Sequence, residues 1–285
     1  MKSLTLNSPA KLNLYLNILR KRPDGYHDIV TIFERIDLVD RITLTVIPSG
    51  IRITSNSREV PLDDSNLAYR AAAMVLQKMK KPLGLHLHLH KRIPVAGGLG
   101  GGSSNAATVL AGLNRLLRLS LSQRTLLAMG RALGADVPFF LLDVPFALGT
   151  GKGDFVTPIR SSVKLTHLLV KNRVKIPTRQ VYQRVNFALT KKDPNVTILR
   201  HFVQKGDVPG LAQSCYNVLE KPAIACYPCI AEVRSALETL QLEGVTLSGS
   251  GPTFFGFAKS LSHARALRKT ILSKHDWDAF VCGTC

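Results

Sequence analysis

The stretch Pro94-Val-Ala-Gly-Gly-Leu-Gly-Gly-Gly-Ser-Ser104 separates a segment with strand periodicity from one with helix periodicity. Five of the six residues 97–102 are glycines, and glycine loses more backbone freedom on folding than any other residue. Without β-carbons, the backbone N–H groups of such a loop can converge on an anion, and the following helix start adds free donors. The stretch therefore predicts a phosphate-binding loop. A flexible linker fits less well, because it would not lead directly into a well-patterned helix.

Two common phosphate-binding motifs do not fit this loop. A Walker A loop needs a lysine after its last glycine, but Ser103 and Ser104 stand there, and Gly151-Lys152 is followed by another glycine. A dinucleotide fingerprint lies close after the first strand of a βαβ series, whereas hairpin-like sequence precedes this loop. The pattern indicates a phosphate loop of another kind.

Upstream of the loop, residues 10–18 alternate strictly between apolar and polar side chains, which predicts a strand with Lys11 and Asn13 on the same face. Residues 22–27 have the composition of a turn, and the alternation over 42–53 predicts a hairpin. A helix is expected from residue 64 to about residue 80, and a strand over 85–90.

Downstream, helices are predicted over about 103–117 and over 122–133, with Ser122 as the N-cap and Gly134 just past the end. Asp136 follows at once, before an apolar turn that contains a proline. Its pattern fits either a local turn stabiliser or a carboxylate held in a dry site, and the sequence does not separate the two.

The chain is expected to divide near residue 155, where residues 149–154 resemble a flexible crossing. The predicted domains are 1–155 and 156–285. Within the second we expect strands over 164–170 and on both sides of the small-residue loop Ser248-Gly-Ser-Gly251, which can bring backbone close to phosphates or to another loop. Helices are expected over 178–187, 195–203, 208–219, 230–240 and 262–272.

Composition places the chain among compact folded proteins. It has 285 residues, 45% of them apolar, and a mean hydropathy of +0.10. No apolar run is long enough to span a membrane, and Met1 to Arg20 does not resemble a signal peptide, so we expect a cytoplasmic protein. The formal charge of +19 predicts anionic partners: a nucleic acid, a multiply charged small substrate, or no specific partner at all if the excess is only a compositional habit.

Two patterns suggest metal ligands, and the sequence favours neither. The histidines of Leu85-His-Leu-His-Leu-His90 share one strand face, but alternation requires a polar face in any half-covered sheet. The pairs Cys226/Cys229 and Cys282/Cys285 lie far apart in the sequence, without the glycines of a zinc knuckle. We therefore expect no metal-binding residues and ordinary free thiols.

Four motifs, in this order, resemble the GHMP kinases: Pro9-Ala-Lys-Leu-Asn-Leu14, the loop 94–104, Gly134-Ala-Asp136 and Ser248-Gly-Ser-Gly-Pro252. The resemblance implies an α+β fold of two domains, an N-terminal ATP domain like ribosomal protein S5 and a C-terminal ferredoxin-like α/β-sandwich domain, with the active site between them. The segment Asp24-Gly-Tyr-His27 is similar to the branch of the family that acts on 4-diphosphocytidyl-2-C-methyl-D-erythritol.

The resemblance implies ATP-dependent phosphorylation of the 2-hydroxyl of that compound, a step of non-mevalonate isoprenoid synthesis. It makes Asp136 the catalytic base and Lys11 its basic partner. The remaining implied site residues fall into two groups. The substrate group is Asn13, Tyr26, His27 and Tyr182, of which Tyr26, His27 and Tyr182 surround the cytosine. The ATP group is Asn66, Leu67, Lys91, Pro94, Val95, Ala96, Gly97, Gly98, Leu99, Gly100, Gly101, Gly102, Ser103 and Ser104.

The family also implies Mg²⁺ with its ATP. The sequence marks no carboxylate as the ligand, which leaves Ser103, Ser104, or phosphates and water to hold the ion. The alternatives are another GHMP kinase, of mevalonate or homoserine type, and an RNA-binding protein. The second is disfavoured because it would leave the glycine loop without a role. We expect small-molecule substrates, no nucleic acid, no membrane, and a monomer or weak homodimer.

Overall fold

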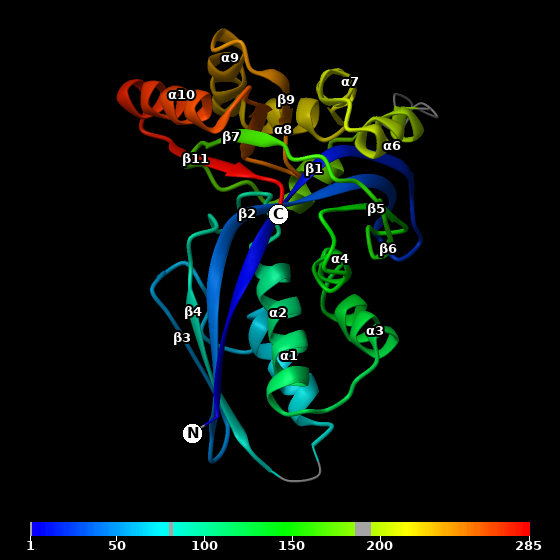
Figure 1. The fold of residues 1–285 in the computed structure, drawn as a ribbon, viewed down its shortest axis with the longest axis vertical. Helices are drawn as coiled ribbons and strands as arrows, with labels where there is room; N and C mark the ends of the chain where they lie inside the picture. Colours follow the sequence, from blue (N-terminus) through cyan, green and yellow to red (C-terminus); the bar gives the residue numbers. More distant parts are fainter. Residues whose placement is uncertain (1, 80–81, 186–194) are drawn as a thin grey trace. The chain divides into compact units, whose positions relative to one another are not determined.

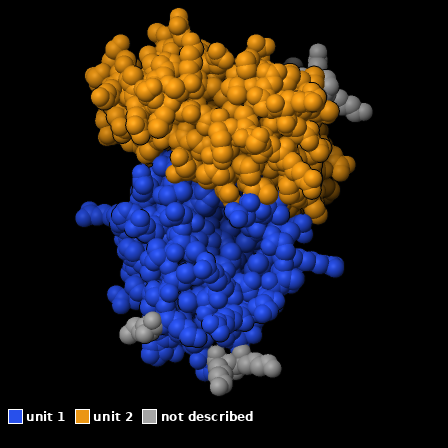
Figure 2. Space-filling model, viewed as in Figure 1, with its two compact units in different colours: residues 1–10, 38–95, 100–143 blue, residues 11–37, 96–99, 144–285 orange. Residues whose placement is uncertain are grey.

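The computed structural model describes residues 2–79, 82–185 and 195–285. These residues form two compact units, each assembled from separate stretches of chain (Figure 2). Unit 1 contains residues 1–10, 38–95 and 100–143, and unit 2 contains residues 11–37, 96–99 and 144–285. The predicted division of the chain into domains 1–155 and 156–285 stays a prediction.

The strands belong to two sheets in the part of the chain that the structure describes (Figure 1). One sheet has the order β3-β4-β2-β1-β8, with β5 paired to β2 and β6 paired to β5, and the other has the order β11-β7-β10-β9. The bounds are β1 Ser3–Lys21, β2 His27–Ile47, β3 Ile51–Ser55, β4 Gly84–His90, β5 Phe146–Thr150, β6 Phe155–Pro158, β7 Thr166–Lys171, β8 Tyr216–Asn217, β9 Glu243–Leu247, β10 Thr253–Phe257 and β11 Asp278–Gly283.

The helices come in groups between runs of strands, which is the pattern of an α+β chain. Their bounds are α1 Leu67–Leu76, α2 Gly101–Leu116, α3 Gln123–Leu133, α4 Val137–Phe140, α5 Thr178–Gln183, α6 Asn195–Lys205, α7 Val208–Ser214, α8 Glu220–Cys226, the 3₁₀ helix η2 Pro228–Ile230, α9 Ala231–Thr239 and α10 Leu261–Lys274. No helix in the described ranges is long and apolar enough to cross a membrane.

The predicted hairpin over 42–53 is wrong. Strands β2 and β3 are not neighbours, because β4 lies between them, antiparallel to β2 and parallel to β3. Gly84 makes this insertion possible, since a β-carbon there would lie 2.2 Å from the backbone carbon of Ser49. Alternation shows which residues share a face of a sheet but not which strand is the neighbour, so the sequence pattern fitted both arrangements.

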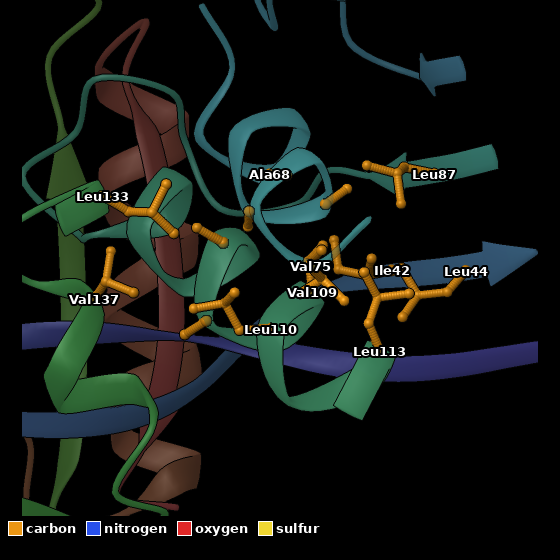
Figure 3. Packing of buried hydrophobic residues seen from close by; sticks show 14 of the residues in the cluster. Ile42, Leu44, Ala68, Val75, Leu87, Val109, Leu110, Leu113, Leu133 and Val137 are labelled. Atoms are coloured by element: carbon orange, nitrogen blue, oxygen red, sulfur yellow. The ribbon is translucent and has the colours of Figure 1, made fainter. Parts of the chain in front are cut away.

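The core of unit 1 lies between its part of the large sheet and the helices α1, α2 and α3 (Figure 3). Ile42, Leu44 and Leu87 point from the sheet toward Val109 and Leu113 of α2, and all five side chains are buried. The spacing of the apolar positions in α2 follows the period of a helix, which puts its buried face on the sheet. This packing fixes α2, and with it the end of the glycine loop.

Unit 2 contains the four-stranded antiparallel sheet, against which α9 and α10 pack. The core of this unit includes Leu168, Val170 and Phe254 of the sheet, which pack in one buried cluster with Val233 of α9 and Ile271 of α10. Residues of β1 and β2 also belong to this unit. Glu34 of β2 is buried and accepts hydrogen bonds from the Thr284 hydroxyl, at 2.7 Å, and from His167 Nε2, at 2.9 Å.

Apart from the hairpin over 42–53, most predicted elements are confirmed, and the main remaining exceptions are in the second half of the chain. Residues 149–154 are not a flexible crossing: Gly149 and Thr150 end β5, and residues 151–154 form the tight turn to its paired strand β6, where Gly151 and Gly153 supply positive φ angles. The helix predicted over 208–219 ends at Ser214 and gives way to β8, while α8 and β11 were not predicted. Residue 80 and residues 186–187, the ends of two predicted helices, lie outside the described residues.

A buried ionic network holds the start of α2 to the sheet. The Asp40 carboxylate, fully buried on β2, is paired with the Lys91 ammonium and accepts a hydrogen bond from the Asn105 amide at 2.9 Å. Its other oxygen accepts from the backbone N–H groups of Arg92, at 2.7 Å, and Ile93, at 2.9 Å. Every partner is a donor, so both oxygens of the buried carboxylate are hydrogen-bonded.

Replacing Asp40 by alanine should be strongly destabilising. The change leaves a nearly buried ammonium, the Asn105 amide and two backbone donors without their acceptor, and breaking a buried pair costs about 3–5 kcal/mol. Chemical denaturation of Asp40→Ala measures this loss. The control is Asp276→Ala, whose carboxylate forms an exposed pair with Arg173 and should leave the unfolding midpoint unchanged. Equal midpoints for both variants would contradict the role of the network.

Candidate active site

The glycine loop packs closely against a second loop because Gly98 has no side chain. Gly98 has φ = +74°, and a β-carbon on it would lie 2.1 Å from the carbonyl oxygen of Ser248. The Gly98 carbonyl in turn accepts a hydrogen bond from the Ser248 hydroxyl at 3.0 Å. The sequence suggested that Ser248-Gly-Ser-Gly251 could contact phosphates or another loop, and the structure confirms contact with another loop.

Asn217 fixes that second loop, and the sequence did not single it out. Its amide nitrogen donates to the carbonyls of Leu247 and Gly249, both at 2.7 Å, and its oxygen accepts from the Leu219 N–H at 2.9 Å. The residue is buried in β8, within a segment whose pattern predicted a helix. No signal in the sequence pointed to it, because the partners that give it a role lie about thirty residues away in the chain.

The loop ends at the N-terminus of α2, whose first turn is open to a ligand. Gly100, at φ = +69°, occupies the N-cap position and offers no side-chain hydrogen bond to the first N–H groups. The first turn contains no acidic residue. Free N–H donors and the positive end of a 16-residue helix form a favourable environment for phosphate.

The first turn of α2 has open space next to Gly102. A β-carbon at Gly102 would meet nothing within 4 Å, so packing does not require a glycine there. In a helix interior, glycine costs about 0.5–1 kcal/mol relative to alanine. The backbone at Gly102 is therefore open to a ligand, and its contact with phosphate stays a prediction.

The two serines after the glycines differ. The Ser104 hydroxyl is fully buried and lies 2.8 Å from the Ser8 hydroxyl, so it belongs to the support of the helix. Ser103 is half-buried, and its hydroxyl lies 3.9 Å from the position of a β-carbon on Gly134. The start of α2 is therefore next to the turn that carries Asp136.

Asp136 lies between α3 and α4, where Gly134 ends one helix and Pro138 stands in the first turn of the next. It occupies the N-cap position of α4 but makes no side-chain capping hydrogen bond, and it is half-buried. Both interpretations that the sequence left open, a local turn stabiliser and a carboxylate held in a dry site, stay predictions.

Lys11 is buried on β1, with only 3% of its surface exposed. Its ammonium donates to Asn13 Oδ1 at 2.5 Å and to the Gly98 carbonyl at 2.9 Å. The predicted shared face of Lys11 and Asn13 is thus confirmed. The lysine also connects the strand to the glycine loop, which the pattern alone did not show.

A short chain of hydrogen bonds orients the Asn13 amide. Its nitrogen donates to the Thr31 hydroxyl at 2.8 Å, and that hydroxyl donates to the Tyr15 carbonyl at 2.6 Å. Because the amide nitrogen is engaged by Thr31, the amide oxygen faces the Lys11 ammonium. All of these groups are buried, which strengthens their electrostatic interactions.

The residues predicted for a base site meet in unit 2. The ring of His27 lies 5.1 Å from that of Tyr182 on α5, at an angle of 35°. Burial, and secondarily the nearby charge of Lys21, lower the pKa of His27 below 6.5, so its ring is neutral near pH 7. Tyr26 is exposed, with the Lys152 ammonium 4.7 Å from its ring centre.

The turn that presents Tyr26 and His27 is held by charges. Arg22 and Arg20 both donate to Asp28, at 2.7 and 2.6 Å, and these hydrogen bonds lower the pKa of that carboxyl. The Arg22 N–H closes the turn on the Tyr26 carbonyl at 2.8 Å. The predicted turn over 22–27 is confirmed.

The remaining predicted ATP residues lie near the starts of helices. Asn66 caps α1, since its amide oxygen accepts from the Ala68 N–H at 2.9 Å, and Leu67 is the first residue of that helix. Lys91 is held by Asp40 and also donates to Asn105 at 2.9 Å. Its ammonium lies 3.4 Å from the position of a β-carbon on Gly101, under the first turn of α2. Contact of these residues with adenosine stays a prediction.

Among the described residues, no group of three or more His, Cys, Asp or Glu side chains is placed to hold a metal ion. His86 and His88 both hydrogen bond to the Thr54 hydroxyl at 2.9 Å. The five cysteines are free thiols, and burial raises the pKa of Cys282 well above its ordinary value.

The comparisons with known proteins agree with this geometry. The family "GHMP kinases N terminal domain" matches residues 66–144, and "GHMP kinases C terminal" matches residues 199–275. The chain is 43% identical to the 4-diphosphocytidyl-2-C-methyl-D-erythritol kinase of Geobacter metallireducens, over 97% of each chain. The chain belongs to this kinase family, within the GHMP kinases.

Solved structures of GHMP kinases have the same fold. In a crystal structure of 4-(cytidine 5'-diphospho)-2C-methyl-D-erythritol kinase, the sequence is 35% identical to that of this chain. The match covers 99% of this chain and 100% of that chain, with a TM-score of 0.84. Homoserine kinase from Cytophaga hutchinsonii, at 19% identity and a TM-score of 0.78, shows the shared fold alone. The predicted α+β GHMP kinase fold is confirmed.

Replacing either of two glycines in the loop by alanine should change stability in opposite directions and tests phosphate binding. Gly102→Ala should raise stability by about 0.5–1 kcal/mol, because alanine favours the helix and meets no neighbour. It should also raise KM for ATP severalfold, because the methyl group occupies the space that phosphates would use. Thermal unfolding and steady-state kinetics measure the two effects. Gly98→Ala is the matched variant and should lower stability, since its β-carbon clashes with Ser248. An unchanged KM in Gly102→Ala would contradict phosphate binding at this turn.

Proposed function

We propose that the chain transfers the γ-phosphoryl group of ATP to the 2-hydroxyl of 4-diphosphocytidyl-2-C-methyl-D-erythritol, in non-mevalonate isoprenoid synthesis. The observation that carries this proposal is the Lys11 ammonium, held at once by Asn13 on the polar face of β1 and by the Gly98 carbonyl of the glycine loop. One buried cation thus joins the residues implied for the sugar alcohol to the loop implied for the phosphates. The names of the relatives support the choice of substrate.

The glycine loop and the first turn of α2 bind the phosphates of ATP in this proposal. Phosphoryl transfer has a loose transition state, so the protein contributes mainly by positioning the groups and stabilising charge. The donors at Gly101 and Gly102 are backbone N–H groups of a packed helix, so they need no rearrangement when the charge develops. Pro94, Val95, Ala96 and the glycines that follow are proposed to form the wall of this site.

Mg²⁺ enters with ATP, and its phosphates and water supply most of the oxygen ligands that this ion prefers. Of the two serines implied as further ligands, Ser104 is committed to Ser8, whereas the half-buried Ser103 suits the ion. The ion would neutralise phosphate charge. The ion is proposed to arrive bound to the nucleotide.

Asp136 is proposed to accept the proton of the substrate hydroxyl. The carboxylate follows directly on the turn next to Ser103 and the start of α2, and a carboxylate can accept the proton of a hydroxyl. Lys11 is proposed to offset the charge of the moving phosphoryl group. Each residue performs one role, and neither needs a covalent intermediate.

The cytosine is proposed to bind at Tyr26, His27 and Tyr182. The contact between His27 and Tyr182 supports this assignment, because aromatic rings brought together from the 22–27 turn and from α5 form a stacking surface. A neutral histidine ring has one donor and one acceptor nitrogen, which suits the polar edge of a base. A mevalonate- or homoserine-type substrate has no base for these rings to recognise.

Other expectations remain part of the proposal. We infer a cytoplasmic enzyme that acts as a monomer or weak homodimer on two small anionic substrates, without a nucleic-acid partner. The +19 charge supports anionic substrates, since a basic surround raises their encounter rate in a salt-dependent way.

Removal of the proposed base should abolish turnover without abolishing nucleotide binding. Asp136→Asn is expected to lower kcat by about 10²–10⁴-fold and to leave the Kd for ATP unchanged. Single-turnover kinetics and calorimetry measure the two quantities. Asp276→Asn removes an exposed carboxylate and is the matched control, expected to keep full activity. A retained kcat in Asp136→Asn would exclude this residue as the base.

The base site can be tested with cytidine diphosphate. His27→Ala should weaken binding of this ligand about tenfold or more, because stacking on a base contributes about 1–3 kcal/mol. His201→Ala, on the exposed face of α6, is the control. Because the His27 pKa is lowered below 6.5, affinity should be constant above that pH and should fall only below it, as the ring gains a proton. Binding of ATP without any binding of cytidine diphosphate would reject the substrate and retain the kinase family.

A further inference from the structure

The described part of unit 1 has a cavity on the face of its sheet that carries no helices. Helices α1 and α2 cover only the other face of β1, β2 and β4 (Figure 1). The cavity has a volume of about 320 Å³, within the range of small-molecule sites, and lies outside the glycine loop. Its lining residues come from three adjacent strands and from the second residue after β4: Asn7, Val39, Arg41, Thr43, His88, His90 and Arg92.

The pairing register of β2 and β4 places the lining side chains side by side. Arg41 is paired with His90 across β2 and β4, and Thr43 is paired with His88. The residues between them, Ile42 and Leu89 among others, are buried under the helices, so alternation directs the lining side chains to the opposite face. The cavity is therefore built on hydrogen-bonded strands, which hold its donors more rigidly than a loop would.

The charged side chains that line the cavity are all basic. Residues 2–9, 41–55 and 82–92, which carry most of this face, contain no Asp or Glu, whereas the exposed Asp37 of β2 accepts a hydrogen bond from the Gly283 N–H. The nearest carboxylate in the sequence, Asp40, points the other way and is fully buried on Lys91, Asn105 and two backbone N–H groups. Within the described ranges, no ion pair involves Arg41 or Arg92. Two guanidinium groups at one cavity are thus left without a counter-charge from the protein.

The other lining groups add hydrogen-bonding capacity. The His88 ring is oriented by its Nδ1, which lies 2.9 Å from the Thr54 hydroxyl, and the Thr43 hydroxyl lies 3.0 Å from that of Thr5. Asn7 and His90 contribute further exposed polar groups from β1 and β4. Guanidinium groups bind phosphate oxygens through two parallel hydrogen bonds, which a hydrophobic or cationic ligand cannot accept.

We propose that this cavity is a second anion site, which binds a small diphosphate group between Arg41 and Arg92. The ligand is either free inorganic diphosphate or the diphosphate portion of a nucleotide, since both present the same oxygens. The site is separate from the proposed ATP site, because none of its lining residues belongs to the stretch 94–104. It also accounts for part of the positive charge that phosphoryl transfer at the glycine loop does not require.

Calorimetry with inorganic diphosphate tests the proposal on the full-length protein, with the ATP site saturated by a nonhydrolysable ATP analogue. Diphosphate should bind at one site per chain, and Arg41→Gln and Arg92→Gln should each weaken it about tenfold or more. The matched control is Arg52→Gln, which removes an exposed arginine on the same sheet face that does not line the cavity. It should bind diphosphate as the unchanged chain does.

Three results would overturn the proposal: no binding once the analogue saturates the ATP site, equal weakening in all three variants, or unchanged binding in Arg41→Gln and Arg92→Gln. Repeating the titration with ADP, on the unchanged chain and on Arg41→Gln, separates the two sources of the ligand. Tighter binding of ADP that Arg41→Gln weakens identifies a nucleotide diphosphate, and tighter binding of inorganic diphosphate identifies the free anion. Unchanged unfolding midpoints and unchanged kcat in the variants exclude a folding defect and separate this site from the proposed function.

Discussion

The carbonyl oxygen of Gly98 accepts hydrogen bonds from both the Lys11 ammonium and the Ser248 hydroxyl, and the rest of the site depends on this convergence. It joins the first strand, the glycine loop and the loop after β9, three segments that are far apart in the sequence. The contact exists only because residue 98 has no side chain, since a β-carbon there would overlap the Ser248 carbonyl. The absence of a β-carbon at residue 98 thus determines where the buried Lys11 ammonium is held.

The sequence predicted the features that depend on local periodicity or on side-chain chemistry within one segment. Alternation placed Lys11 and Asn13 on one face, and the helix period together with Ser122 and Gly134 placed α3. The proximity of His27 and Tyr182 came from the family resemblance, since no local pattern relates residues so far apart in the chain. The structure brings their rings together.

The features that were missed depend on partners far along the chain. Asn217 looks like any polar residue in a helical stretch, and only the carbonyls of Leu247 and Gly249 give it a role. Asp40 stands on the buried face of β2 between Leu38 and Ile42, and its burial becomes acceptable only because Lys91, just after β4, and Asn105 of α2 pair with it. The insertion of β4 beside β2 is of the same kind, because period-2 patterning does not encode strand order.

The interleaving of the two compact units limits how this chain can be dissected. Because the chain passes from one unit to the other after residues 10, 37, 95, 99 and 143, neither unit corresponds to one continuous fragment. A truncated protein that ended near residue 155 would keep Glu34 and lose His167 and Thr284, which would leave a buried carboxylate without its donors and strand edges without their partners. Such a fragment is expected to aggregate, so structural studies of either half need the intact polypeptide.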